Sequence, residues 1–208
     1  MNEFVVKRNE LLAQKVIKGL EKRNMTGYWA PDKAAALKTA LSLIPEGGSV
    51  GMGGCFSAQE IGLTDELKSG RYRFIDRSQM DPLEVKLANC DADVFVSSAN
   101  AMTEDGILVN IDGNSNRVSN IAFGPKKVIF IVSINKVCSD VDAAMKRARG
   151  VAAPTNAQRF GLSTPCAKTG SCMDCLSPDT ICCQFLIRRF SRHAGRIHVI
   201  LVGEPLGF

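Results

Sequence analysis

Four cysteine side chains in the segment "CAKTGSCMDCLSPDTICC" have the spacing of metal ligands. Cys172 and Cys175 form a Cys-x2-Cys pair, and Cys166 and Cys182 lie close enough along the chain to complete a set of four thiolates. Glycine, serine and proline between them supply the turns that such a set requires. Eight cysteines in a chain of 208 residues favour metal binding over disulfide bonds if the compartment is reducing. We therefore predict a metal centre at these four residues.

The spacing of the cysteines leaves the kind of metal open. Zinc suits four thiolates, but zinc sites more often contain two Cys-x2-Cys pairs, and this segment has one. The spacing is near that of a plant-type ferredoxin, although not equal to it. A set of buried free thiols is the alternative to any metal. Cys183 is predicted to be a non-ligand packed against the sheet, because neighbouring side chains of an extended chain alternate.

A glycine-rich turn, "GMGGCFS", is the second candidate. Gly51, Gly53 and Gly54 follow a predicted strand and would let backbone N–H groups approach an anion, which the N-terminus of the next helix would also favour. Cys55 stands where a helix N-terminus would lower a thiol pKa, although such a cysteine is more often a packed residue. The spacing matches neither the dinucleotide-binding fingerprint nor the P-loop lysine motif, so NAD and ATP are not indicated. A tight turn that binds nothing is the alternative.

The polar stretch "TEDGILVNIDGNSNRV" is the third candidate, because its side chains follow the ends of two predicted strands. Ligands of open α/β sheets bind beyond the carboxyl ends of the strands. The residues concerned are Asn100, Thr103 and Glu104 after one strand, and Asp112, Asn114, Asn116 and Arg117 after the next. If the carboxylates of Glu104 and Asp112 face one crevice within about 10 Å of each other, they could act as acid, base or nucleophile. Two ordinary turns are the alternative, because Asp-Gly is a common turn pair.

The elements that must position these residues follow from the spacing of apolar side chains. Helices are expected over residues 3–23, in the alanine-rich run up to Ile44, after Ser57, over 81–88 and after Asp140. Ser57, with Glu60 three residues on, is predicted to cap its helix. Strands are expected at residues 28–30, 73–75 and 107–111, and at "SVGMGG", "DVFVSSAN" and "KKVIFIVSINKV". Two further strands that flank "SRHAG" are predicted to form a closing hairpin.

Helices therefore alternate with strands along most of the chain. This order predicts an α/β fold, with a mostly parallel sheet that carries helices on both faces. Residues 1–208 are expected to form a single domain that includes a cysteine-rich segment at 166–183, near the C-terminus.

Composition and charge exclude several kinds of partner. The basic residues exceed the acidic ones by five but are scattered in pairs, and one tryptophan and two tyrosines offer few rings for bases to stack on, so no nucleic-acid partner is expected. The charged N-terminus lacks the apolar core of a signal peptide, and no apolar run approaches the roughly 18 residues of a membrane span. We expect a cytoplasmic protein with no membrane partner, which binds a small anionic or hydroxy-acid ligand.

Several stretches together resemble the lactate-utilisation (LUD) domain family, formerly a domain of unknown function. They are "IPEGGSVGMGGCFSAQEIGL", "TEDGILVNIDGNSNRV", "FGPKKVIFIVSINKV", "VAAPTNAQR" and "ILVGEPLGF". The resemblance implies the fold of the phosphosugar isomerases and the family I coenzyme A transferases. It also implies a link to a bacterial complex that oxidises L-lactate to pyruvate with iron–sulfur partner subunits. That redox association favours an iron–sulfur cluster over zinc at the cysteines.

Three functions are consistent with this resemblance. The first is an enzyme or a subunit of a redox complex, in which the chain oxidises L-lactate or a related hydroxy acid with iron–sulfur partners. The second is a metal-stabilised scaffold or ligand-binding subunit without turnover. The third is an enzyme like the coenzyme A transferases or sugar-phosphate isomerases, because Glu104-Asp105-Gly106 resembles the Glu-Asn-Gly turn whose glutamate forms the acyl intermediate in the transferases. A homo-oligomer or a complex is expected, and the residues leave open whether the chain catalyses a reaction on its own.

Overall fold

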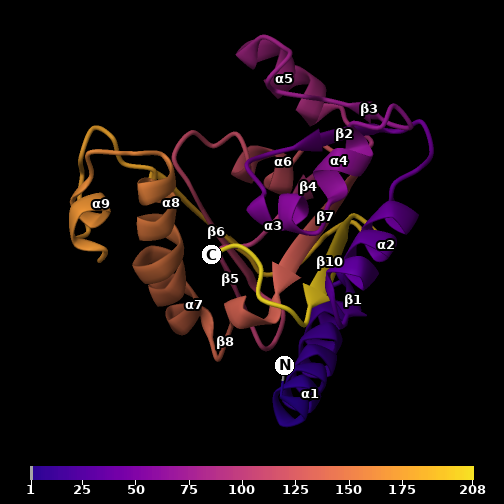
Figure 1. Ribbon diagram of the computed structural model, residues 1–208, viewed down its shortest axis with the longest axis horizontal. Coiled ribbons are helices and arrows are strands. Elements are labelled where there is room, and N and C mark those ends of the chain that lie inside the picture. Colours follow the sequence, from indigo (N-terminus) through magenta and orange to yellow (C-terminus); the bar gives the residue numbers. More distant parts are fainter. Residues whose placement is uncertain (1) are drawn as a thin grey trace.

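A six-stranded parallel sheet lies at the centre of the computed structural model, which describes residues 2–208 (Figure 1). Its strands run in the order β1 (Thr26–Ala30), β10 (Ile197–Val202), β7 (Lys127–Ser133), β4 (Val94–Ser97), β2 (Ser49–Met52) and β3 (Arg73–Phe74). All neighbours are parallel, so their carboxyl ends meet at one edge. A ligand site is therefore expected along that edge.

Helices cover both faces of this sheet. The first face is covered by α2 (Lys33–Leu43), α3 (Phe56–Glu60) and α4 (Leu63–Leu67), and the second by α1 (Glu3–Lys22) and α6 (Val118–Ala122). Strand side chains alternate between the two layers: Val94 and Val96 pack on the first side and Phe95 on the second. Helix α5 (Pro82–Cys90) follows β3.

A smaller sheet packs beside the second face. It has the order β8 (Val137–Cys138), β5 (Ala101–Thr103), β6 (Leu108–Asp112) and β9 (Gln184–Arg188). Met102 and Leu108 join the core of the large sheet, whereas Ala101 and Val109 pack against the helices on the outer side. The residues they contact belong to α7 (Val141–Arg147) and to the π-helical turn (Ala148–Ala152) that joins α7 to α8 (Ala153–Arg159), and α7 and α8 lie beside the small sheet in Figure 1. The short helices η1 (Ile134–Lys136) and α9 (Pro165–Thr169) complete the fold.

The α/β fold with a mostly parallel sheet is confirmed, and so are two predicted helix starts. Asp140 caps α7 by accepting a hydrogen bond from the Ala143 N–H at 2.8 Å, and Asp81 caps α5, where Pro82 takes the first helical position. Nowhere in residues 2–208 is there a helix with the length and apolar character needed to cross a bilayer.

Two local predictions are wrong. The strands that flank "SRHAG" form no hairpin: β9 pairs with β6 in the small sheet, and β10 lies between β1 and β7 in the large one. The six buried residues of β10 suit a central strand, whereas β9 alternates between half-buried and exposed residues, as an edge strand does. Ser57 caps no helix, because α3 begins at Phe56 and its N-cap residue is Cys55.

Candidate anion-binding site

The turn at Glu104–Gly106 joins β5 to β6 and packs against α1. Lys15 of α1 forms an ion pair with Glu104, and Arg23 forms one with Asp105. A Cβ atom at Gly106 would lie 2.7 Å from the backbone of α1, and the φ of +90° also requires glycine there. The Thr103 hydroxyl closes the same turn by accepting a hydrogen bond from the Ile107 N–H at 2.8 Å. This end of the polar stretch therefore attaches the hairpin to α1.

Asp112 lies at the other end of β6. Strands β5 and β6 are antiparallel, with Met102 opposite Leu108, and Asp112 lies four residues beyond Leu108. At about 3.3 Å per residue, roughly 13 Å of strand separates it from the turn. The prediction that Glu104 and Asp112 share one crevice is wrong. The turn that contains Glu104 is at one end of the antiparallel hairpin, and Asp112, the last residue of its second strand, is at the other end.

The Asp112 carboxylate holds the loop that follows β6. One oxygen accepts a hydrogen bond from the Asn114 N–H at 3.0 Å. The other accepts from the Arg117 N–H at 2.9 Å and the Val118 N–H at 3.1 Å. Asp112 is 8% exposed, so these bonds are shielded from water. Its position assigns Asp112 to building the loop that carries Asn114, Asn116 and Arg117.

Replacing Asp112 by alanine is expected to lower the free energy of unfolding by about 2–3 kcal/mol, because three backbone N–H groups lose a charged acceptor. Asp112→Asn retains an acceptor oxygen and should cost less. Urea denaturation of the two variants checks the order. Equal stability of Asp112→Ala and the wild type would contradict this role.

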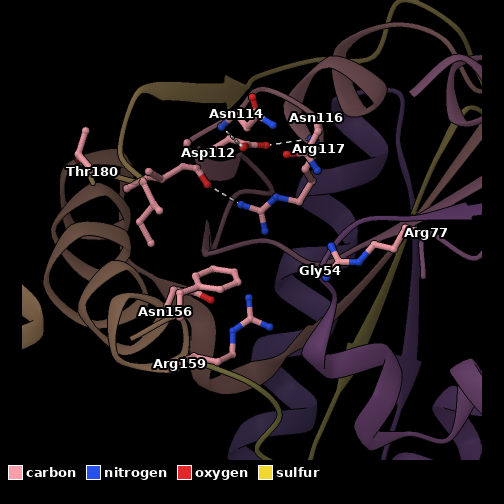
Figure 2. Close-up of a pocket in the computed structure, with 13 residues that line it drawn as sticks. Gly54, Arg77, Asp112, Asn114, Asn116, Arg117, Asn156, Arg159 and Thr180 are labelled. Carbon is pink, nitrogen blue, oxygen red and sulfur yellow. Dashed lines mark hydrogen bonds between the residues drawn. The ribbon is translucent and has the colours of Figure 1, made fainter. Parts of the chain in front are cut away.

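A cavity of about 440 Å³ opens beside this loop (Figure 2). Three guanidinium groups approach it from different sides: Arg77 from the loop after β3, Arg117 from the start of α6, and Arg159 from the end of α8. In the described part of the chain, no carboxylate forms an ion pair with any of the three. Asp112 also lines the cavity, but its carboxylate accepts hydrogen bonds from backbone N–H groups, and the three positive charges exceed its single negative charge. This excess of convergent positive charge makes a site for an anion.

The electrostatics of these arginines agree with an anion site. Burial lowers the pKa of Arg117, an effect that Asp112 opposes. Partial burial, followed by the charge on Arg77, lowers the pKa of Arg159. The positive charges therefore repel one another in a partly desolvated space, and a bound anion would relieve that repulsion.

Small and amide-bearing residues complete the walls. A Cβ atom at Gly54 would lie 3.6 Å from a guanidinium nitrogen of Arg159 and 3.9 Å from one of Arg77, so the missing side chain leaves the space between them open. Asn114, Asn116 and Asn156 also line the cavity and offer both donors and acceptors.

A smaller chamber of about 30 Å³ continues from this cavity, and the two share Gly54, Arg117, Asn156 and Arg159 as walls. Its floor holds Lys136, Ser57, Ser98 and Asn100.

Lys136 is 2% exposed, and its Nζ donates to the Ser98 hydroxyl at 3.2 Å and the Ser57 hydroxyl at 3.4 Å. Burial lowers the pKa of Lys136 to about 8. The Asn100 side-chain oxygen accepts from a guanidinium nitrogen of Arg117 at 2.9 Å, which links this chamber to the cavity.

The structure places the remaining predicted ligand residues differently. Gly53 lies under Arg117, whose Cγ would be 3.5 Å from a Cβ atom there. Gly51 lies inside β2, where a Cβ atom would collide with Asn89 of α5. Cys55 is buried in the core, and burial raises its thiol pKa. Gly51, Cys55 and Thr103 line neither cavity.

Sequence reasoning missed several lining residues. Asn156 and Arg159 stand three residues apart in "TNAQR", a spacing that puts both on one face of α8 and that could have indicated them. Lys136 was detectable as a single cation after a buried strand. Arg77 carries no such signal, because it lies in an irregular loop.

Five of the eight cysteines lie in α9 or in the segment between α9 and β9. Within residues 2–208, no three His, Cys, Asp or Glu side chains lie close enough to coordinate one metal ion. Cys182 packs against the small core formed with α7, and Cys183 is exposed. The predicted alternation of these two side chains is present, but the prediction that Cys183 packs against the sheet is wrong.

Comparisons with known proteins agree with this fold. The model of the LUD domain family matches residues 13–202. The crystal structure of a DUF162 family protein from Deinococcus radiodurans is similar, with a TM-score of 0.55 and 11% sequence identity over 94% of this chain and 98% of that one. No curated protein matches the chain. Because the family model covers most of its length, the chain belongs to the LUD domain family, which is associated with lactate utilisation.

Proposed function

We propose that this chain binds a small 2-hydroxy carboxylate of the lactate type in the arginine-lined cavity. The observation that supports the proposal most strongly is the convergence of Arg77, Arg117 and Arg159 on a space where no carboxylate pairs with them among the described residues. A guanidinium group matches a carboxylate with two parallel hydrogen bonds. The lactate-utilisation association of the family supports a hydroxy acid as the anion.

The floor of the site suits the hydroxyl group of such a ligand. Ser57, Ser98 and Asn100 offer hydrogen-bonding groups within the smaller chamber, which has room for one or two heavy atoms. Lys136 lies among them, and its pKa of about 8 lets it exchange a proton near neutral pH. In a hydroxy-acid oxidation, the neutral form of Lys136 is placed to take the hydroxyl proton, while the hydrogen on Cα leaves as a hydride, with the two electrons, to a hydride acceptor in a redox complex.

A thermal-shift series with small anions tests the proposal. L-lactate and glycolate should raise the melting temperature in a concentration-dependent way, because a ligand that binds only the folded state stabilises it. Acetate, which lacks the hydroxyl group, should have a smaller effect, and the neutral amide of lactate should have none. Equal shifts with lactate and its amide would overturn the proposal, since the arginines would then make no contribution.

Binding of the anion is expected to weaken as the pH rises through about 8, where Lys136 loses its proton. The folded-state pKa is below the ordinary value of 10.5, so the unfolded chain binds more protons between these two pH values, and the ligand-free protein gains stability there. The dissociation constant for L-lactate should therefore increase between pH 7 and pH 9. The titration of Lys136 should not lower the stability of the ligand-free protein over the same range. Lys136→Met should remove most of the pH dependence. An unchanged pH profile in Lys136→Met would contradict the assignment.

A further inference from the structure

The cysteine-rich segment has little hydrophobic packing to hold it. Residues 170–183, all described, form no helix or strand. Met173 is 60% exposed and Leu176 is 98% exposed, so the apolar side chains of the loop contribute little burial. A long irregular loop without its own core needs another source of order.

The thiols of this segment are neighbours in space as well as in sequence. Cys182 interacts electrostatically with Cys172, Cys166 and Cys175, although fifteen residues separate Cys166 from Cys182 along the chain. Cys166 belongs to α9, Cys172 and Cys175 to the loop, and Cys182 lies just before β9. The fold thus brings together the four residues that the spacing singled out.

A cation stands beside these thiols. Arg149, in the π-helical turn between α7 and α8, interacts electrostatically with Cys172 and forms an ion pair with Asp174. The Thr164 hydroxyl lies 3.3 Å from the sulfur of Cys166. A cation and a hydroxyl group beside these sulfurs are suitable partners for ligands that carry negative charge when they bind a metal.

The cysteine segment is also a wall of the arginine-lined cavity. Thr180 and Ile181, directly before Cys182, line that cavity. A Cβ atom at Gly113 would lie 2.9 Å from the Cα of Ile181, so the loop after β6 and the cysteine segment are in close contact. A group bound by the cysteines would therefore be a near neighbour of the ligand.

We propose that Cys166, Cys172, Cys175 and Cys182 bind an iron–sulfur cluster beside the anion site. The thiols neighbour one another, but no three of the described metal-ligating side chains gather as closely as the ligands of one ion. Four thiolates around zinc, each at about 2.3 Å, must stand only about 4 Å apart. In a cluster of four irons, each thiolate binds a different iron, so wider spacing fits. Binding releases the thiol protons, because the thiolate is the ligand.

Anaerobic purification tests this proposal without any ligand for the arginines, so its outcome is independent of the proposed function. The protein is reconstituted with ferrous iron and sulfide, desalted, and assayed for iron, acid-labile sulfide and zinc. Iron and sulfide in equal amounts with a broad absorption band near about 400 nm are expected. Protein that retains neither iron nor sulfide, or that retains zinc in their place, would overturn it.

Single substitutions assign the ligands. Cys166→Ser, Cys172→Ser, Cys175→Ser and Cys182→Ser should each lose more than half of the bound iron. Cys183→Ser is the matched control, because it is adjacent to Cys182 and exposed, and Cys138→Ser is a second control; both should keep the wild-type iron content. Cys172 is exposed, so Cys172→Ser should fold even if Cys182→Ser does not. A Cys172→Ser protein with a full cluster, or a Cys183→Ser protein without one, contradicts the ligand set.

Discussion

The double substitution of Arg77 and Arg159 by glutamine is expected to weaken L-lactate binding by about 100-fold or more. Each arginine would make charge-assisted hydrogen bonds to the carboxylate, and losing such a bond costs about 1.5–3 kcal/mol. Because each 1.4 kcal/mol corresponds to about tenfold in the dissociation constant, two losses give two or more powers of ten. Isothermal titration calorimetry measures the change.

The fold should tolerate this double variant. Both side chains are exposed at the mouth of the cavity and form no ion pair within residues 2–208, so their replacement removes mutual repulsion. Arg159→Gln also removes cation–π contacts with Phe160 and Phe208, which at an exposed site contribute only about 0.5–1 kcal/mol. Arg189→Gln with Arg192→Gln is the matched control, because it removes the same charge from exposed positions away from the cavity. Equal loss of affinity in both double variants would mean that net charge, and not this site, governs binding.

The substitution Gly54→Val is expected to abolish binding while the fold survives. A Cβ atom there meets only the guanidinium ends of Arg159 and Arg77, at ordinary contact distances, and Gly54 is absent from the positive-φ positions. The two methyl groups of valine then extend into the space that the carboxylate needs. Gly54→Ala, with one methyl group, should retain part of the affinity.

Binding and folding are measured separately for these glycine variants, by calorimetry and by circular dichroism. Gly150→Val is the control, because nothing lies within 4 Å of a Cβ atom at that exposed position, which is away from the cavity. Unchanged binding in Gly54→Val would place the ligand elsewhere. Loss of the fold would show instead that Gly54 serves the turn alone.

The parts of the fold that depend on local chemistry could be predicted from the sequence. Asp140 caps α7 and Asp81 with Pro82 starts α5, because these residue types satisfy free N–H groups wherever a helix begins. The alternation of helices and strands likewise implies a parallel sheet. Pairing between distant strands was not predictable in this way: β9 and β10 are close in sequence, but they enter different sheets because one is an edge strand and the other is central.

The candidate site was predictable only in part, for the same physical reason. Asp112, Asn114, Asn116 and Arg117 come from one loop, and their position after a strand indicated them. Their partners Arg77, Asn156 and Arg159 come from two other segments, so only the tertiary fold brings them together. Glu104 was misplaced because its turn was taken as a strand end at the ligand edge, whereas the antiparallel hairpin carries it to α1.

Calorimetric titration of the wild-type protein with L-lactate and with its neutral amide at pH 7 tests whether the three arginines bind the carboxylate of a small hydroxy acid. The two compounds have nearly the same size and share the hydroxyl group, so they differ mainly in the charge that the arginines should recognise. We expect saturable binding of one L-lactate per chain and no measurable binding of the amide, with the lactate heat lost in the Arg77→Gln and Arg159→Gln double variant. Absence of L-lactate binding, or equal binding of lactate and its amide, would contradict the account.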